Sequence, residues 1–353
     1  MLLAIDLAFI LEKLILIIIV VMASLVIAMY ATYAERKVAA VLQDRRGPNR
    51  AGPFGLLQPV ADGLKLFFKE EIIPDFSSKA LFILGPSLAM LTAVMTGAVV
   101  PWGDKIHFFG RDIALQVADV NIGILYVFGV VSLGVYGIMI GSWASNNKFS
   151  LIGGLRAASQ IISYELAMGI SLIALLMVTG TLSLKEMVVQ QQNGPWNIIY
   201  QPLGFLIFLI CAFAECNRTP FDLPEAENEL IGGYHTEYSS MKLGFYLFSE
   251  YINMFVSSVI MATLFFGGYD LLPFVDEAQW GLSDNWMALI GIAALMTKVI
   301  FFLFLFMWVR WTIPRFRYDQ LMNLGWRILI PLALVNMVIT GALILLKQNH
   351  WHF

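Results

Sequence analysis

Long apolar stretches, separated by short polar segments, dominate this chain. A helix needs about 20 apolar residues to cross a bilayer, so stretches of this length predict membrane-spanning helices. Eight can be marked, near residues 12–34, 80–101, 120–142, 160–180, 200–216, 243–267, 287–309 and 327–346. The fifth is the shortest. The pattern predicts an all-α polytopic membrane protein with eight transmembrane helices, which form one membrane domain over residues 1–353.

A helical periodicity also lies between the first two predicted spans, over residues 55–70. Apolar residues recur there at intervals of three and four, whereas Gln58, Asp62, Lys65 and Lys69 occupy the other face. This spacing predicts an amphipathic helix at the membrane interface. Two interpretations fit the pattern: a surface anchor with solvated charges, or one wall of an entrance for an amphiphilic ligand that arrives from the lipid.

The fifth loop, residues 215–242, is acidic. Five of its carboxylates fall within fifteen residues: Glu215, Asp222, Glu225, Glu227 and Glu229. Pro224 suits the first position of a short acidic helix, with Gly232 and Gly233 as its stop. Carboxylates beside a bilayer are costly, so this loop is the first candidate for the functional site. The alternative is a solvated acidic loop that docks a basic partner surface.

Basic residues set the predicted orientation. Most lysines and arginines fall in the first, third, fifth and seventh loops, which the positive-inside rule places in the cytoplasm. An even number of spans then puts both termini on the outer, periplasmic side. The chain has 59% hydrophobic and only 13% charged residues, which excludes soluble globular and disordered chains. The formal net charge of -3 gives no indication of a nucleic-acid partner.

The sequence offers no pattern for metal or nucleotide chemistry. Cys211 and Cys216 lie five residues apart, which turns them about 140° from each other on a helix, so they cannot chelate a metal together. We predict that both are small core residues. The histidines fall in loops or near the end of the chain, and no glycine-rich phosphate loop follows a strand. We therefore predict no metal and no covalent cofactor on this chain.

Four acids lie on the predicted cytoplasmic side of the spans. Glu35 and Glu215 end the first and fifth spans. Glu165 and Glu250 lie roughly 10 Å inside the fourth and sixth spans, at about 1.5 Å of rise per residue. An ionisable residue placed centrally in a span costs roughly 2.5 to 3.5 kcal/mol on insertion scales, so it needs a partner or water. These acids predict a proton relay. The alternative is that each is a helix-end charge that reaches the headgroups.

Lys298 lies in the middle of a predicted span. It lies about 18 Å from Arg310 along the seventh helix, which puts it near the middle of the membrane. A lone lysine at that depth pairs with an acid or contacts water. Lys298 therefore joins the candidate relay, and a structural ion pair between helices is the alternative.

Four ordered motifs connect the chain to a known family. Residues 33–40 read YAERKVAA, residues 44–50 read DRRGPNR, and residues 214–229 read AECNRTPFDLPEAENE. The segment 301–334 contains WVRWTIPRFRYDQLM. These motifs resemble the family of the NADH-quinone oxidoreductase H subunit, called NADH dehydrogenase subunit 1 in mitochondria, which is the quinone-chamber membrane subunit of respiratory complex I. The resemblance covers nearly the whole chain.

The resemblance implies a subunit at the junction between a hydrophilic electron-transfer arm and a proton-pumping membrane arm, in a bacterial plasma membrane. Its cytoplasmic loops would close a chamber for the substrate quinone, ubiquinone or menaquinone, against the hydrophilic-arm subunits that carry the terminal iron–sulfur cluster. Neighbouring membrane-arm subunits and lipid would be its other partners. FMN and the iron–sulfur clusters would lie on partner subunits, so we expect no turnover from this chain alone.

The acids and the resemblance together define the predicted site. The predicted proton-relay and coupling residues are Glu35, Glu165, Glu215, Asp222, Glu225, Glu227, Glu229, Glu250 and Lys298. The predicted quinone-chamber residues are Arg36, Arg46, Tyr234, Glu237, Tyr238 and Arg310. No residue of this chain is predicted to be catalytic in the redox step.

Two other functions are compatible with parts of the pattern. The membrane anchor of a related energy-converting hydrogenase would share the resemblance without using quinone. A stand-alone cation/proton antiporter would also place acids and a lysine in its spans, but it would not need the long basic first loop or the acidic fifth loop. Many such transporters consist of repeated halves, and the sequence shows none. The subunits that co-purify with the chain would separate these functions.

Overall fold

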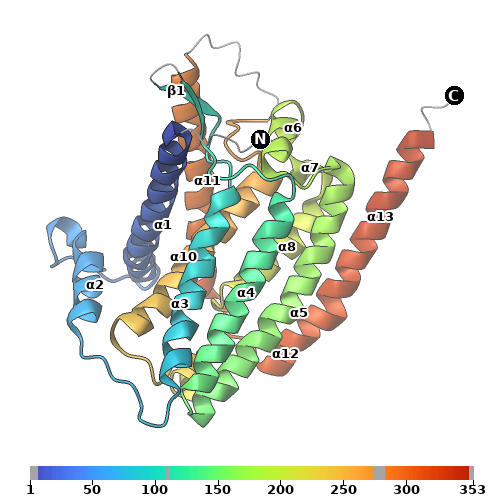
Figure 1. The fold of residues 1–353 in the computed structure, drawn as a ribbon. Coiled ribbons are helices and arrows are strands. Elements are labelled where there is room, and N and C mark those ends of the chain that lie inside the picture. Colours follow the sequence, from blue (N-terminus) through green and yellow to red (C-terminus); the bar gives the residue numbers. More distant parts are fainter. Residues whose placement is uncertain (1–6, 109–110, 274–282, 350–353) are drawn as a thin grey trace, which may run out of the picture.

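The computed structural model describes residues 7–108, 111–273 and 283–349, which form a bundle of long helices (Figure 1). Seven helices among the described residues are long and apolar enough to cross a membrane. They are α1 (Leu7–Leu42), α3 (Lys79–Thr96), α4 (Gly123–Ala144), α5 (Lys148–Thr179), α10 (Ser240–Phe265), α11 (Asp284–Thr312) and a continuous last helix. The last helix consists of α12 (Tyr318–Asn323), a π-helical turn (Leu324–Leu329) and α13 (Ile330–Asn349).

The predicted fifth span corresponds to α8 (Pro202–Glu215), which follows the single turn α7 (Asn197–Tyr200). The 14 residues of α8 are apolar but fewer than the about 20 that a full crossing needs. The fold is therefore a nearly all-α bundle with seven membrane-capable helices among the described residues, and the eighth crossing stays a prediction.

Helix α5 is longer than its apolar stretch predicts. It begins at Lys148 rather than near residue 160, because the side chain of Asn147 accepts a hydrogen bond from the backbone N–H of Phe149 and caps the first turn. It ends at Gly180, whose φ of 69° suits glycine. Glu165 consequently lies about 25 Å from the start of its helix, and not the 10 Å expected from the sequence.

A two-stranded hairpin departs from the all-α prediction. Strands β1 (Lys105–Phe108) and β2 (Arg111–Ala114) pair antiparallel, with Lys105 opposite Ala114. The backbone N–H of His107 donates to the Asn285 side chain at the start of α11, at 2.7 Å. Four-residue strands carry little periodicity of their own, and this contact with a distant helix helps to hold them. A further connection contains the short helix α6 (Leu184–Gln192).

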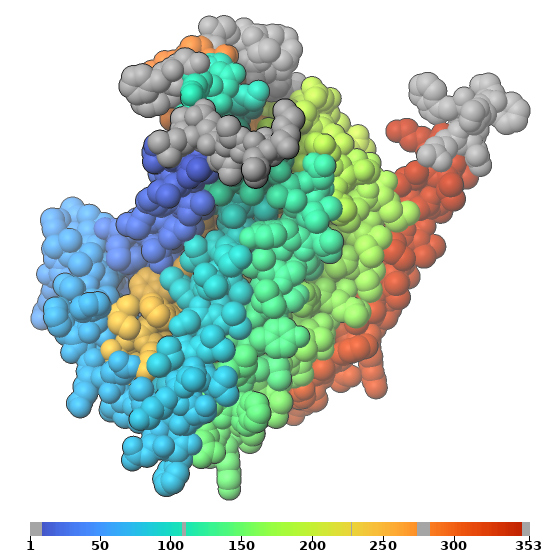
Figure 2. Space-filling view, in the orientation of Figure 1, coloured from blue at the N-terminus to red at the C-terminus, as the bar shows by residue number. Residues whose placement is uncertain are grey.

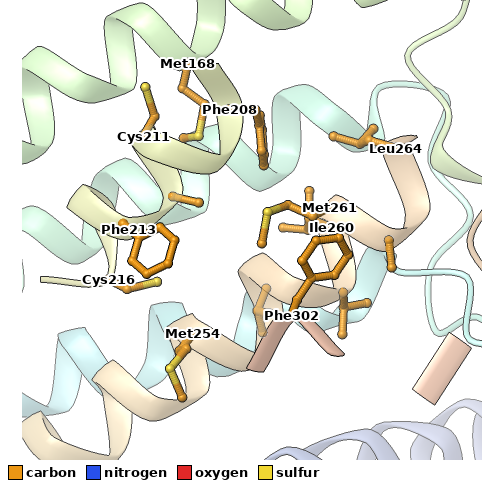
Figure 3. Packing of buried hydrophobic residues seen from close by; sticks show 14 of the residues in the cluster. Met168, Phe208, Cys211, Phe213, Cys216, Met254, Ile260, Met261, Leu264 and Phe302 are labelled. Atoms are coloured by element: carbon orange, nitrogen blue, oxygen red, sulfur yellow. The ribbon is translucent and has the colours of Figure 1, made fainter. Parts of the chain in front are cut away.

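The core lies where α5, α8, α10 and α11 meet (Figure 3). Met168 of α5, Phe208 of α8, Met261 of α10 and Phe302 of α11 are buried in one cluster. Cys211 and Cys216 are free and buried beside them, which confirms the prediction that both are core residues. Protein rather than lipid thus surrounds most of α8. Neighbouring helices bury most of its apolar surface although the helix is short.

Helix α2 (Gln58–Phe68) stands beside α1, apart from the main bundle (Figure 1). It falls inside the segment predicted to be amphipathic and follows a short 3-10 turn, η1 (Pro53–Gly55). In Figure 2, atoms of α10 (gold) reach the surface between α1 and α2 on one side and α3 on the other. The first residues of α1 and the last residues of α13 lie at the same end of the bundle, the upper one in Figure 1.

Candidate functional site

The acidic loop folds back on itself between α8 and α10. Its only regular elements within the described residues are the single turn α9 (Glu227–Leu230) and the 3-10 turn η3 (Gly233–His235). The predicted helix from Pro224 is therefore wrong: the turn begins three residues later and ends before Gly232. A Cβ added at Gly233, which has a φ of +59°, would lie 1.7 Å from the carbonyl oxygen of Pro224. This close approach folds the loop tightly and leaves no room for a longer helix.

A buried ion pair links this loop to α10. Arg218, in the loop, and Glu250, on α10, are each 5% exposed. The Nη2 atom of Arg218 lies 3.6 Å from Oε2 of Glu250. The hydroxyl of Tyr234 donates to the other carboxylate oxygen of Glu250 at 2.8 Å. Charges at this depth are stable only when paired, and here the partners come from distant parts of the chain.

Tyr251 connects this pair to a second one. Glu35, at the far end of α1, is 6% exposed and forms an ion pair with Arg310 of α11. The hydroxyl of Tyr251 donates to the carboxylate of Glu35 at 2.8 Å. The guanidinium of Arg218 lies 4.1 Å from the centroid of the Tyr251 ring, within the range of cation–π attraction. The charge row, as we call it, therefore runs through Arg310, Glu35, Tyr251, Arg218, Glu250 and Tyr234.

Two carboxyl groups of the loop lie beside the charge row. Burial raises the pKa of Glu225 to about 7, and the negative charge of Glu250 contributes to this rise. Burial and the charge of Glu225 together raise the pKa of Asp222 to about 6, although Arg315 pairs with it at 2.8 Å. Burial thus outweighs the nearby positive charges. Both groups can exchange a proton near neutral pH.

A pocket of about 470 Å³ opens between α1, α2, α10 and α11. Its volume lies within the range of about 300 to 1,000 Å³ that is typical of small-molecule sites. Glu35 and Arg310 of the charge row line it, and Arg36 and Asp62 pair across it at 2.7 Å. The rest of the lining is mostly apolar and includes Met29, Leu66, Leu247, Phe248 and Trp311. The pocket therefore offers a charged side and an apolar side to one ligand.

Glu165, on α5, and Glu215, at the end of α8, lie outside the charge row. The hydroxyl of Ser132, on α4, donates to the carboxylate of Glu165. Glu215 lines a cavity of about 20 Å³ together with Asn253 and Ser257, both on α10. A cavity of this size holds about one water molecule when it has polar partners, and these three side chains supply them.

Comparison with known proteins identifies the family. The chain is 68% identical over 338 residues to H subunit 1 of the NADH-quinone oxidoreductase of Cytophaga hutchinsonii, which covers 96% of this chain and 98% of the relative. It is 65% identical over 341 residues to the NADH-quinone oxidoreductase H subunit of Flavobacterium johnsoniae, or 96% of each chain. A family model described as NADH dehydrogenase matches residues 14–341. The chain belongs to the family of the NADH-quinone oxidoreductase H subunit.

Membership of this H subunit family confirms the resemblance found in the motifs, all of which fall within the matched residues. The similarity also extends beyond these two relatives: H subunit 1 of the enzyme of Geobacter metallireducens is 47% identical over 344 residues, 98% of this chain and 99% of the relative. With seven membrane-capable helices in the part of the chain that the structure describes, this member of the family is a multi-pass membrane protein.

Of the residues predicted for the quinone chamber, the structure places some in the lining of the pocket and others outside it. Arg36 and Arg310 line the pocket. Tyr238 is buried elsewhere, where its hydroxyl donates to the carbonyl of Gly141 at 3.0 Å. Glu237 accepts a hydrogen bond from Asn147 at 2.5 Å, and Arg46 is exposed in the first loop. Tyr234 belongs to the charge row rather than to the pocket lining.

Two further predicted relay residues, Glu229 and Lys298, lie away from the charge row. Glu229 pairs with Arg156 at 2.6 Å on the surface, and the side chain of Glu227 lies outside the parts that the structure describes. The ammonium group of Lys298 donates to the backbone carbonyls of Phe266, Gly268 and Asp270, beyond the end of α10. It also lies 4.4 Å from the ring centroid of Trp196. These contacts give Lys298 a structural role in the loop after α10.

Sequence reasoning missed several residues of the pocket and the charge row. Asp62 and Lys65 belong to the polar face of the predicted amphipathic helix, a face that the pattern left to solvent or ligand. Tyr251 directly follows Glu250, but a tyrosine in a span carries no specific signal. Arg218 is one of many arginines in the loops predicted to be cytoplasmic, and only the fold shows that it is buried.

Proposed function

We propose that this chain is the membrane subunit of a proton-translocating NADH:quinone oxidoreductase that forms much of the quinone-binding chamber. The observation that carries this proposal is the pocket between α1, α2, α10 and α11, whose charged side continues directly into the charge row. Family membership supports it, since the relatives are named as the H subunit of NADH-quinone oxidoreductase.

The lining suits a quinone because that ligand is amphiphilic. Its isoprenoid tail would pack against Leu247, Phe248 and Trp311. Its carbonyl oxygens accept hydrogen bonds, which the arginines at the charged side could donate. Reduction of a quinone to a quinol takes up two electrons and two protons. The electrons would come from the terminal iron–sulfur cluster of a hydrophilic-arm subunit, and this chain would bind and orient the substrate.

The charge row would carry the consequence of reduction away from the pocket. Negative charge that forms on the quinone would compete with Glu35 for Arg310, because both would attract the same guanidinium. Tyr251 and Arg218 would pass this change to Glu250 and then to the titrating groups of the loop, Asp222 and Glu225. Glu165 and Glu215 would extend the relay toward the neighbouring antiporter-like subunits. Lys298 and Glu229 have partners outside this route, and their part in the relay stays a prediction.

Photoaffinity labelling of the assembled complex tests the proposal. A quinone with a photoreactive group on its tail, added to the complex purified from bacterial plasma membranes, should label residues 59–66 of α2 and 247–251 of α10, which line the pocket. Excess unmodified quinone should prevent the labelling. An active complex whose labelling falls entirely outside these two segments would contradict the assignment. The NADH dehydrogenase subunits that co-purify would separate this function from those of a hydrogenase anchor or an antiporter.

A further inference from the structure

Helix α2 is fastened to the first turn of α10 by contacts between residues far apart in the sequence. The hydroxyl of Ser240 donates to the carbonyl of Leu66, at the end of α2, at 3.1 Å. The backbone N–H of Ile72 donates to the hydroxyl of Ser239 at 3.0 Å. Glu71 and Lys242 form an ion pair between the same two segments. We call these three contacts the α2 clasp.

The residues of the α2 clasp are held in place by their surroundings. Ser240 is buried and has a φ of +55°, which is uncommon for a residue other than glycine and persists only where the surrounding structure enforces it. The ammonium group of Lys242 also lies 5.5 Å from the ring centroid of Phe82 on α3. The side chain of Lys242 is 12% exposed, whereas that of Glu71 is 52% exposed. The α2 clasp therefore joins α2, α3 and α10 at one place.

The α2 clasp bears on the pocket because α2 has few other attachments. Its Phe67 and Phe68 point away from the protein and are largely exposed. At the pocket, the pair of Arg36 and Asp62 holds it to α1. Leu66 both lines the pocket and accepts the hydrogen bond from Ser240. The distance between the two pocket walls, α2 and α10, thus depends on the α2 clasp.

We propose that Glu71, Ser239 and Lys242 are positioning residues that hold α2 at the distance from α10 at which the pocket accepts its ligand. The inference rests on the proposed quinone site. Loss of the α2 clasp lets α2 move outward, so a smaller fraction of the molecules has a pocket ready to bind. The apparent affinity for quinone falls by that fraction, while the redox step, which occurs between quinone and the partner's cluster, is unchanged.

A double-mutant cycle on the assembled complex tests the pair. Lys242→Met and Glu71→Gln should each raise the KM for quinone about two- to fivefold, the range expected from a partly exposed ion pair, with kcat unchanged. The double variant should raise it no further than the single ones, because the two residues act through one contact. Lys242→Arg keeps the positive charge and should have the wild-type KM. Lys79→Met, an exposed lysine at the start of α3, is the matched control and should leave KM unchanged.

A second measurement separates the α2 clasp from the quinone site. Phe76, in the segment after α2, is 89% exposed, and chymotrypsin should cleave there several-fold faster in Lys242→Met than in wild type or Lys79→Met. Faster cleavage with an unchanged KM would show that the α2 clasp holds α2 in place, but it would contradict the proposed effect of the clasp on the pocket. Unchanged cleavage in Lys242→Met, or additive effects of the two substitutions in the cycle, would overturn the inference. It would also be overturned if the complex failed to assemble in Lys242→Met and in Lys242→Arg alike. If the photoreactive quinone labelled only residues outside the pocket, the proposed function would be overturned instead.

Discussion

At the scale of single residues, the unusual feature is how many charges lie inside the protein. Arg218 and Glu250 are almost completely buried, and a hydrophobic pair of similar size would often be at least as stable. The pair is also incomplete, because two nitrogen atoms of Arg218 lack a hydrogen-bond partner among the described residues. Stability alone is thus a weak reason for these charges. A site whose charges must respond to a reaction accounts for them better.

Glu225 gives a prediction that concerns pH. Its pKa in the folded protein, about 7, lies above the ordinary 4.5, so the folded state binds more protons than the unfolded state between these values. The wild-type protein should therefore lose stability as the pH rises from about 4.5 to about 7, and no further above that. Glu225→Gln has no such group. Its heat stability relative to wild type should increase across this window, as measured by thermal inactivation of the assembled complex.

Glu70→Gln is the control for this experiment, because Glu70 is an exposed carboxyl group in the segment after α2. Its difference from wild type should be nearly the same at pH 5 and pH 8. If Glu225→Gln also showed a difference that did not change with pH, the buried carboxyl group would not be titrating in this range.

At the scale of elements, α2 shows how a helix can be correctly placed and incompletely interpreted. Its apolar face, with Phe67 and Phe68, points outward, as expected for a helix at a membrane interface. Its polar face supplies Asp62 and Lys65 to the pocket lining. This geometry favours the interpretation of α2 as one wall of an entrance for an amphiphilic ligand.

Gly63 makes the role of α2 testable. It lines the pocket, and a Cβ added there would meet nothing within 4 Å, so a larger side chain fits the fold but occupies pocket space. Gly63→Leu should raise the KM for quinone about tenfold or more, since one methylene group too many in an apolar pocket already costs about 1 to 3 kcal/mol of binding. Gly129→Leu makes the same change in open space on α4 and should leave KM unchanged. Equal KM values for both variants would argue against ligand binding beside α2.

At the scale of the whole molecule, the acids form two groups with different surroundings. Glu35 belongs to the charge row and lines the pocket, whereas Glu215 lines the small cavity and Glu165 accepts a hydrogen bond from Ser132. A relay between the groups needs a proton path through that cavity. A water molecule held in that cavity, together with the hydroxyls of Ser132 and Ser257, would be its carriers.

Glu165→Gln tests the part of the relay that lies outside the charge row. Glutamine has nearly the same shape but cannot release a proton, so the complex should assemble while coupled quinone reduction and proton translocation are both impaired. The measurement is the amount of protons moved into inside-out membrane vesicles as NADH is oxidised. Glu186→Gln, on the surface helix α6, is the control and should pump like wild type. Unchanged turnover and pumping in Glu165→Gln would remove this residue from the relay.

Much of the site could be found from the sequence because ionisable residues stand out against apolar stretches. Glu35, Glu165, Glu215 and Glu250 were recognisable in this way, and Arg36 and Arg310 through the family motifs. Tyr238 and Glu237 belong to the same motif-rich region, yet their hydrogen bonds with Gly141 and Asn147 turn them away from the pocket. Proximity in sequence places a residue near a site, but only packing decides which way its side chain points.

The sequence by itself determined the membrane class, the positions of the long helices, the amphipathic nature of α2 and the family, because all of these depend on local composition and motifs. Only the tertiary structure decided that Gly233 packs on Pro224, and that Arg218 and Tyr251 join Glu35 to Glu250. The physical reason is that burial and pairing are long-range properties. The cost of a charge is set by neighbours that the chain brings together from more than two hundred residues away, as it does for Glu35 and Arg310.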